Sequence, residues 1–492
     1  MSPSQSSPLR RPHKADELVI SEPNPFGADL FQRGAIAKNL GALIRTIEQP
    51  FVLLLTAPFG SGKTTFLRMW SQSLTNDGHM CFYFNAWEND FVEDPTVALV
   101  GELHRLIAGK RLGIDPQSKT ALALQRVKTV AATVLKATIP IALRAVTHGI
   151  LDADRLKGRL TAVEGVRDAV GDISEEVGKD VIDSYSKERE SLLGFRSTLS
   201  ELVTELLAEG QPTKRPIVFF IDELDRCRPP FAIALLERLK HLFTVPDILF
   251  VVAVDRNQLR HSLRGAYGSG IDADGYLRKF FDLEFGLPPP SSDAFCKHLA
   301  QVLEFGRLLA GRHDAVVCVN ELARYFSLLS DALGFSLRVQ EQCFTRIGFV
   351  LATTPKNAQV LPQGIAVLIA IQAWRPDLYE SYRDGTAGAR EVIAAIEQNS
   401  GGPKFLASIE ATVTCATLAA WSHDVGTPAG IENEWMQQLR DQQMDSTKQA
   451  RIRSWSERFH QLQGMVPDTY SELKGFAFQR VDFLRSIQTV AP

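Results

Sequence analysis

The sequence predicts an α/β fold, with a three-layer core around a mainly parallel sheet and an all-helical C-terminal region. Two apolar runs of strand length, at 51–55 and 217–221, each lead directly into residues typical of a ligand site. Amphipathic helical segments follow these runs, which is the alternation expected of a sheet covered by helices on both faces. From Ser291 onward, apolar residues recur at helical spacing and no strand pattern returns.

The composition is that of a globular protein without extreme charge. The chain has 492 residues, 45% hydrophobic and 23% charged, and this length predicts two or three domains. The formal net charge of −3 gives no bulk electrostatic case for nucleic-acid binding. Six cysteines are scattered without a C-x-x-C pair, which argues against a zinc site or a disulfide framework and favours a reducing cytoplasm. Residues 1–22 open with a Ser/Pro-rich basic stretch that lacks a signal-peptide core, and we expect a disordered tail.

A glycine loop after the first apolar run is the strongest motif. Gly60 and Gly62 allow backbone N–H groups to turn inward, and the N-terminus of the following helix favours an anion. This strand–loop–helix order is the context of a phosphate-binding P-loop. Lys63 is expected to reach the β- and γ-phosphates, and the Thr64 hydroxyl to ligate Mg²⁺. The usual pattern begins with glycine, and Ala57 retains the small size which that position needs. The predicted binding loop comprises Ala57, Pro58, Phe59, Gly60, Ser61, Gly62, Lys63, Thr64 and Thr65.

A turn and an amphipathic helix, from Arg33 to Ile47, precede the first strand. In many P-loop ATPases a segment at this position packs on the adenine ring, so Leu30, Phe31 and Arg33 are candidates for that contact. Ordinary core packing and a surface arginine explain the same residues equally well.

The second strand is rich in aromatic residues and ends in a polar group of side chains. Asn85, Trp87 and Glu88 follow the run from Met80 to Phe84. In open α/β sheets the ligand lies at the carboxyl ends of the strands, so these side chains are expected near the site.

Residues 112–197 interrupt the α/β alternation with a helical insertion rich in Ala, Val, Lys and Arg. Its segment from Thr129 to Leu151 is apolar enough to suggest a membrane span. Lys136 and Arg144 would each cost about 2.5–3.5 kcal/mol near the bilayer centre, more than the apolar residues return, and Pro140 interrupts the segment. We therefore favour a soluble insertion. A helix on a membrane surface and a partner-binding hairpin are the alternatives.

The second apolar run delivers an acidic pair to the same edge of the sheet. Five apolar residues, Ile217 to Ile221, precede Asp222 and Glu223. Asp222 is expected to hold Mg²⁺ through its water shell, and Glu223 to polarise the attacking water. An apolar run followed by an acid is weak evidence in isolation, but it is strong when it follows a P-loop in this order.

Three further residues are candidates for the same site. Asp255 ends the strand from Ile248 to Val254, where either a γ-phosphate sensor or a helix N-cap fits. Arg278, or its neighbour Lys279, is a candidate cationic finger, although a surface cation is the commoner role. Arg338, at the start of a helix, is a candidate to reach the nucleotide from a lid.

These signals predict five parts of the chain. They are a tail at 1–22, a core at 23–111 and 198–290, an insertion at 112–197, a helical lid at 291–375, and a C-terminal helical domain of unknown role at 376–492.

Together the motifs resemble the KAP-type P-loop NTPases, in the additional-strand, catalytic-glutamate branch. The family often carries a helical or transmembrane insertion between its two Walker motifs, and the long stretch between Lys63 and Asp222 fits one. Its second motif usually reads Asp-Asp, whereas Asp222-Glu223 here suits a catalytic base. The resemblance covers roughly residues 24–350 and rests on residues 29–37, 57–65, 84–88, 221–227, 252–255 and 276–279, the last followed by a Leu-Pro.

The resemblance implies an ATPase that works with ATP and Mg²⁺ as a conformational switch or assembly factor. The family includes bacterial phage-exclusion proteins and an animal membrane scaffold, so antiviral defence is an expectation from the family alone. Protein partners through the insertion or the C-terminal region, and a homo-oligomer, are expected, and membrane contact is less favoured. The alternatives are an ATP-gated scaffold with little turnover and a membrane-surface organiser that uses residues 126–151.

Overall fold

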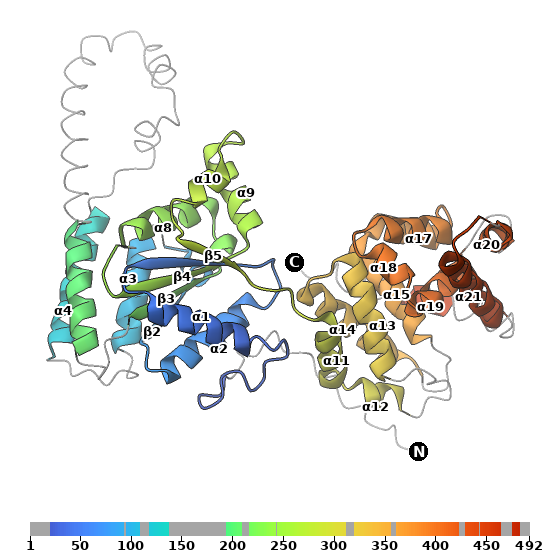
Figure 1. Ribbon diagram of the computed structural model, residues 1–492, viewed down its shortest axis with the longest axis horizontal. Helices are drawn as coiled ribbons and strands as arrows, with labels where there is room; N and C mark the ends of the chain where they lie inside the picture. The colour runs from blue at the N-terminus through green and yellow to red at the C-terminus, as the bar shows by residue number, and fades with distance from the viewer. Residues whose placement is uncertain are drawn as a thin grey trace, which may run out of the picture. The chain divides into compact units, whose positions relative to one another are not determined.

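The chain folds into two compact units, residues 20–289 and the residues from 290 on (Figure 1). The expected tail up to residue 19 and most of the expected insertion lie outside the residues that the structure describes, so both stay predictions. The structure, a computed structural model, describes residues 20–92, 95–108, 118–136, 193–208, 216–242, 244–310, 319–355, 361–422, 429–441, 443–463 and 475–482.

The described strands of the first unit form one parallel sheet in the order β2-β3-β4-β1-β5. The strand β4 lies between β1 and β3 and pairs with both, through Leu54↔Val252 and Ile221↔Val252. The P-loop strand and the acidic strand are thus separated by an additional strand, and their carboxyl ends lie at one edge. This confirms the predicted parallel sheet. The strands are β1 (Phe51–Thr56), β2 (Cys81–Asn85), β3 (Ile217–Asp222), β4 (Ile248–Val254) and β5 (Leu283–Gly286).

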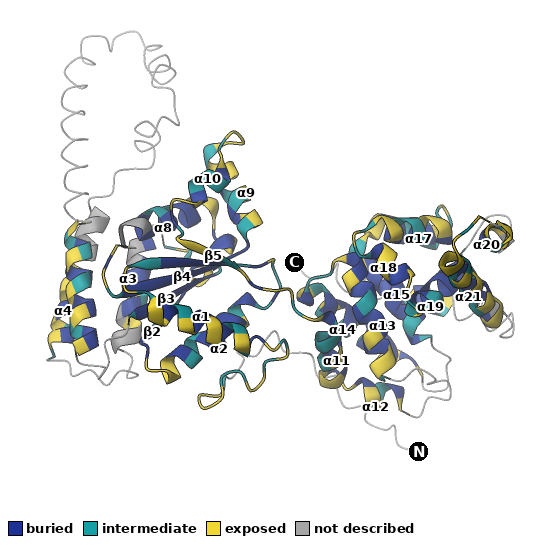
Figure 2. Cartoon of the chain, viewed as in Figure 1, coloured by how far each residue is buried: buried dark blue, intermediate teal, exposed yellow. Residues whose placement is uncertain are grey.

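Helices cover both faces of this sheet and complete the three predicted layers (Figure 1). Successive side chains of a strand point to opposite faces, so Leu53 and Leu55 pack against α1 and α2, whereas Val52 and Leu54 face the other layer. Both faces are apolar, and Figure 2 shows the strands buried between the helices. The helices are α1 (Gly34–Thr46), α2 (Lys63–Asn76), α3 (Pro95–Ala108), α8 (Pro229–Leu242), α9 (Arg256–Tyr267) and α10 (Ala273–Leu277).

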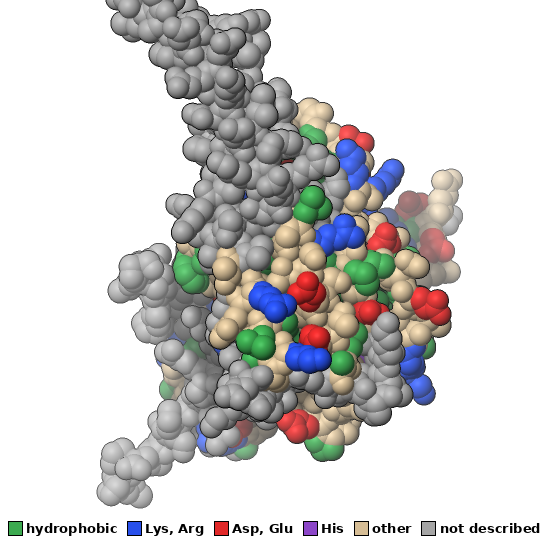
Figure 3. Space-filling view, turned by 90° about the vertical axis from the view of Figure 1, so that its left-hand side faces the viewer, with side chains coloured by type: hydrophobic (Ala, Val, Ile, Leu, Met, Phe, Trp, Pro, Cys, Tyr) green, Lys and Arg blue, Asp and Glu red, His purple; other side chains and the backbone are tan. Residues whose placement is uncertain are grey.

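The base of the predicted insertion belongs to the core. The helix α4 (Lys119–Lys136) and a helix at 193–208 add apolar side chains, among them Val127 and Leu202, to the layer that contains α3. On the described part of this face, acidic and basic side chains are interspersed (Figure 3). Within the described ranges, no helix has the length and the apolar character needed to cross a membrane. Most of the segment from Thr129 to Leu151 lies outside them.

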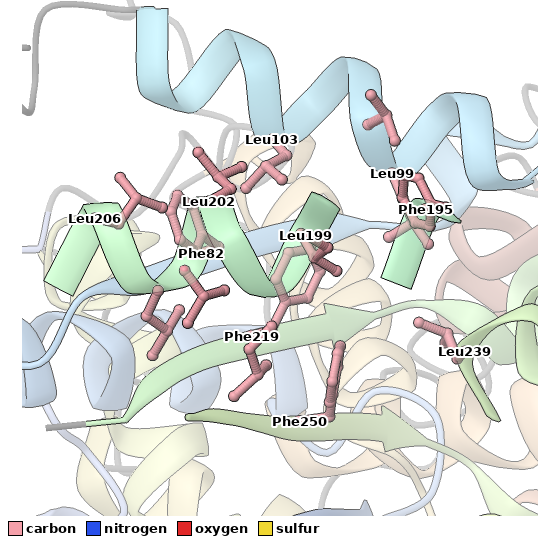
Figure 4. A pocket seen from close by; sticks show the side chains of 14 residues that line it. Phe82, Leu99, Leu103, Phe195, Leu199, Leu202, Leu206, Phe219, Leu239 and Phe250 are labelled. Carbon is pink, nitrogen blue, oxygen red and sulfur yellow. The ribbon is translucent and has the colours of Figure 1, made fainter. Parts of the chain in front are cut away.

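A small cavity of about 40 Å³ lies between the sheet, α3 and the helix at 193–208 (Figure 4). Its wall is entirely apolar and includes Phe82, Phe195, Leu202 and Phe219. An ordered water needs two to four polar partners, and this wall offers none. We therefore assign the cavity to imperfect core packing.

In its described residues, the second unit is helical and has one core. A single hydrophobic cluster extends from Cys296 to Val481, so the boundary expected at residue 375 falls inside a packed core. The reason is α15, in which Ile365 to Ile371 are all buried because neighbouring helices surround it. The described helices are α11 (Ser292–Val302), α12 (Phe305–Leu309), α13 (Val319–Leu333), α14 (Leu337–Thr353), α15 (Pro362–Trp374), α16 (Pro376–Asp384), α17 (Ala389–Gln398), α18 (Gly402–Leu406), α19 (Glu410–Trp421), α20 (Ala429–Arg440) and α21 (Ser446–Gln463).

Candidate nucleotide-binding site

The loop between β1 and α2 has the backbone of a phosphate cradle. Gly60 and Gly62 adopt φ values of +71° and +81°, in the left-handed region that favours glycine. A Cβ on Gly62 would lie 3.3 Å from Nη1 of Arg33, so a side chain there would crowd Arg33 as well as strain the backbone.

Several hydrogen-bond donors of the loop are available to bind an anion. The backbone N–H groups of Gly60, Gly62, Lys63 and Thr64 have no acceptor among the described residues, and no side chain caps α2. The buried hydroxyl of Ser61 likewise has no hydrogen-bond partner in the described structure. Unpaired donors at a helix N-terminus are the features that bind phosphate.

Lys63 connects the loop with the acidic strand. Its Nζ donates to the carbonyl oxygens of Ala57 at 2.7 Å and Pro58 at 3.3 Å, and it lies 3.8 Å from Oδ2 of Asp225. Burial lowers the pKa of Lys63, and the nearby carboxylates, Asp225 foremost, oppose that shift. The two motifs therefore meet at one point of the sheet edge.

The Asp222 carboxylate is fully buried and held at both oxygens. Its Oδ2 accepts a hydrogen bond from the Tyr83 hydroxyl at 2.6 Å, and its Oδ1 accepts one from the backbone N–H of Glu223 at 2.9 Å. Each oxygen keeps a free lone pair, so Asp222 can still accept a water bound to Mg²⁺. With Thr64 in the first turn of α2, these residues fit the metal expected beside a bound triphosphate.

Glu223 adopts φ +59° and directs its carboxylate toward two partners. Oε1 lies 2.9 Å from Nη1 of Arg226, and Oε2 accepts a hydrogen bond from Nδ2 of Asn85 at 3.3 Å. Asn85 also donates to Glu88 at 3.0 Å, so the polar end of β2 does meet the acidic pair. Burial raises the pKa of Glu223, and Arg226 opposes the shift.

A comparison with protein families agrees with this geometry. The model of the KAP family P-loop domain matches residues 33–317, more than half of the chain. The chain belongs to this family. The comparison with curated proteins gave no match. The KAP domain is a P-loop NTPase domain, a class that generally binds nucleotide together with Mg²⁺, and the loop, Lys63 and Asp222 fit both ligands.

Asp255 joins the KAP P-loop to the strand that follows the acidic motif. Oδ1 accepts the backbone N–H of Asn257 at 3.0 Å and caps α9, so the N-cap role is present. Oδ2 accepts the backbone N–H of Phe59 at 3.1 Å. Asp255 thus also ties down the loop, which distinguishes it from an ordinary cap.

Arg33 is buried against the KAP P-loop and is not a surface side chain. Nη1 donates to the carbonyl oxygen of Ser61 at 2.9 Å, and Nη2 donates to that of Pro288 at 2.8 Å. The guanidinium carbon lies 5.1 Å from the centre of the Phe31 ring, so Phe31 and Arg33 form one group beside Gly62. Burial lowers the pKa of Arg33.

Within the described part of the first unit, no contact brings Arg278 to the loop. Arg278 is exposed at the end of α10, and the chain after it returns to the amino end of β1, where Asp282 accepts the backbone N–H of Val52. Its neighbour Lys279 lies over the Tyr276 ring. Arg338 belongs to α14 of the second unit.

Sequence reasoning missed two residues of this KAP site, Asp225 and Tyr83. Asp225 is buried beneath Lys63 and accepts the backbone N–H of Asp255 at 2.7 Å, and burial raises its pKa. The third acid in Asp222-Glu223-Leu224-Asp225 was the available signal for it. Tyr83 gave none, because a tyrosine in a buried aromatic strand is indistinguishable from a core residue.

Proposed function

We propose that this KAP family protein hydrolyses ATP in the presence of Mg²⁺ and uses the reaction to switch its helical unit. The observation that carries the proposal is the approach of Lys63 to Asp225, beside Asp222 and Glu223. It joins a phosphate-binding loop to a carboxylate group supplied by a separate stretch of chain. This combination is what phosphoryl transfer to water requires.

The loop and Lys63 are proposed to bind the triphosphate. The free N–H groups and the Ser61 hydroxyl would donate hydrogen bonds to the phosphate oxygens, and Lys63 would exchange its carbonyl partners for the β- and γ-phosphates. Thr64 and Asp222 are the residues that would hold Mg²⁺, which supplies charge neutralisation between the phosphates.

Glu223 is proposed to orient the attacking water and to accept its proton. Its partial burial and raised pKa suit a general base better than a fully solvated carboxylate would. Asn85 holds the second oxygen of Glu223 and so orients the group.

A hydrogen-bonded path supports the proposed switch. Arg33 bridges the carbonyl of Ser61, in the loop, and that of Pro288, near the last residue of the first unit. A change in the loop on nucleotide binding would therefore be transmitted through Arg33 to Pro288, next to the start of the helical unit. Bacterial anti-phage defence is the setting that the family resemblance suggests for this switch.

Steady-state phosphate release by the full-length protein tests the proposal. Glu223→Gln should lower kcat by about 10² or more, the effect of losing a positioned general base. Glu201→Gln, at an exposed position of the helix at 193–208, is the matched control and should leave turnover unchanged. A Glu223→Gln protein that hydrolyses ATP at the wild-type rate would defeat the assignment.

A second candidate is an ATP-gated scaffold that hardly turns over. The observation in its favour is the ion pair between Glu223 and Arg226, in which Arg226 engages the carboxylate that is proposed as the general base. The scaffold hypothesis predicts that the purified protein retains bound ATP and releases no phosphate. The ATPase hypothesis predicts that the nucleotide retained after purification is ADP.

A further inference from the structure

We propose that Arg226 is a phosphate-binding cation of this site, and that it alternates between Glu223 and the terminal phosphate of the bound nucleotide. The inference rests on the proposed function and adds a residue to it. It also gives Arg226 the role of cationic finger, for which the sequence suggested Arg278.

Arg226 lies over the phosphate-binding loop. It ends the short 3₁₀ helix η2 (Leu224–Arg226) that follows β3. Its guanidinium carbon is 5.8 Å from the centre of the Phe59 ring and 5.6 Å from that of the Trp87 ring. Phe59 belongs to the loop, and Nζ of Lys63 lies 5.2 Å from the same ring. Two cations thus share one aromatic ring of the loop.

The surroundings of Arg226 leave it able to change partner. Its side chain is 35% exposed, against 12% for Glu223 and 9% for Lys63, so the arginine end of this ion pair reaches solvent. Ion pairs that reach solvent are weak and readily exchanged. Stacking on aromatic rings leaves the N–H groups at the guanidinium edge free for bidentate contact with a phosphate.

Other arginines whose contacts reach the site have other tasks. Arg33 is committed to the carbonyl oxygens of Ser61 and Pro288. Arg68 lies over the ring of Tyr83, which in turn holds Asp222. Arg226 differs because its partner is a carboxylate whose charge a phosphate can replace.

The exchange would couple nucleotide binding to the base. When Arg226 donates to the terminal phosphate, Oε1 of Glu223 loses its partner while Asn85 continues to hold Oε2. The freed oxygen can then accept a hydrogen bond from water. Since ADP lacks the terminal phosphate, Arg226 should contribute to the preference for ATP over ADP.

The test compares Arg226→Ala, Arg226→Lys and the matched control Arg228→Ala in the full-length protein. Arg228 lies two residues away, is 61% exposed and pairs with Asp90, which lies after β2. Affinities for ATP and ADP with Mg²⁺ are measured by displacement of a fluorescent ATP analogue, and kcat by phosphate release. Arg226→Ala should weaken ATP binding about tenfold, leave ADP binding nearly unchanged and lower kcat about 10². Arg226→Lys should recover part of both losses, and Arg228→Ala should match the wild type.

An unchanged ratio of ATP to ADP affinity in Arg226→Ala would overturn the inference. Equal losses for both nucleotides, with a lower melting temperature and no recovery by lysine, would instead make Arg226 a structural partner of Glu223. If Arg226→Ala does not fold, Arg226→Lys and Arg226→Gln carry the comparison. A wild-type protein that binds ATP without hydrolysing it would defeat the proposed hydrolysis, and the binding comparison would still test Arg226.

Discussion

Nζ of Lys63 lies 3.8 Å from Oδ2 of Asp225, although the two residues belong to motifs far apart in the sequence. Both side chains are buried, and each compensates the other for charge that burial would otherwise penalise. This pair identifies Asp225 as the acid that most compensates the charge of the buried P-loop lysine.

Replacing Asp225 by alanine should lower the free energy of unfolding by about 3 kcal/mol, because Lys63 would remain buried without its counter-charge. Urea unfolding followed by circular dichroism measures the change. Saturating ATP with Mg²⁺ should restore part of the loss, since phosphate would take the place of the carboxylate. Asp77→Ala, which removes an exposed pair with Arg45, is the control and should cost less than about 1 kcal/mol. Equal losses in the two variants would contradict the role assigned to Asp225.

Replacing Tyr83 by phenylalanine should weaken the apparent affinity for Mg²⁺ about tenfold, because the hydroxyl that orients Asp222 is lost. Titration of phosphate release with Mg²⁺ at saturating ATP gives the value. Tyr276→Phe is the matched control, since the Tyr276 hydroxyl contacts Glu237, which is not part of the site. If the wild type, Tyr83→Phe and Tyr276→Phe all show the same Mg²⁺ dependence, the hydrogen bond from Tyr83 to Asp222 does not contribute to metal binding.

Replacing Gly62 by alanine should abolish ATP binding and destabilise the protein by about 1–2 kcal/mol, since φ +81° and the approach of Arg33 both disfavour a Cβ. Isothermal titration calorimetry and thermal unfolding report the two effects. Gly265→Ala, in α9 with open space around its Cα, should instead stabilise by about 0.5–1 kcal/mol. Wild-type affinity in Gly62→Ala would rule out this loop as the nucleotide cradle.

Replacing Arg33 by lysine should cost about 2 kcal/mol of stability and reduce ATP affinity. An ammonium group cannot reproduce the planar fork that spans the carbonyls of Ser61 and Pro288. Chemical denaturation and nucleotide titration measure these changes. Arg45→Lys, at a surface ion pair, should be neutral on both. If Arg33→Lys is also neutral on stability and ATP affinity, the two hydrogen bonds from Arg33 to the carbonyls of Ser61 and Pro288 contribute to neither.

The parts of the site that the sequence predicted are those whose chemistry is local. The loop from Ala57 to Thr65 needs its glycines and its lysine at neighbouring positions, because backbone N–H groups and one side chain must surround a single anion. Asp222 and Glu223 follow an apolar strand for a similar reason, since a buried parallel strand presents its next residues at the ligand edge. Each of these two motifs spans fewer than about a dozen residues, so each can be recognised without knowledge of the fold.

The remaining features depend on contacts between residues far apart in the chain. Tyr83 reaches Asp222 and Arg33 reaches Pro288 because β2 lies beside β3 and β5 lies beside β1. The order of strands comes from packing that no short segment encodes. The same holds for the single core of the helical unit, where α15 is buried by helices that precede and follow it. Local chemistry therefore specified what the site is built to hold, and long-range packing specified which distant side chains support it.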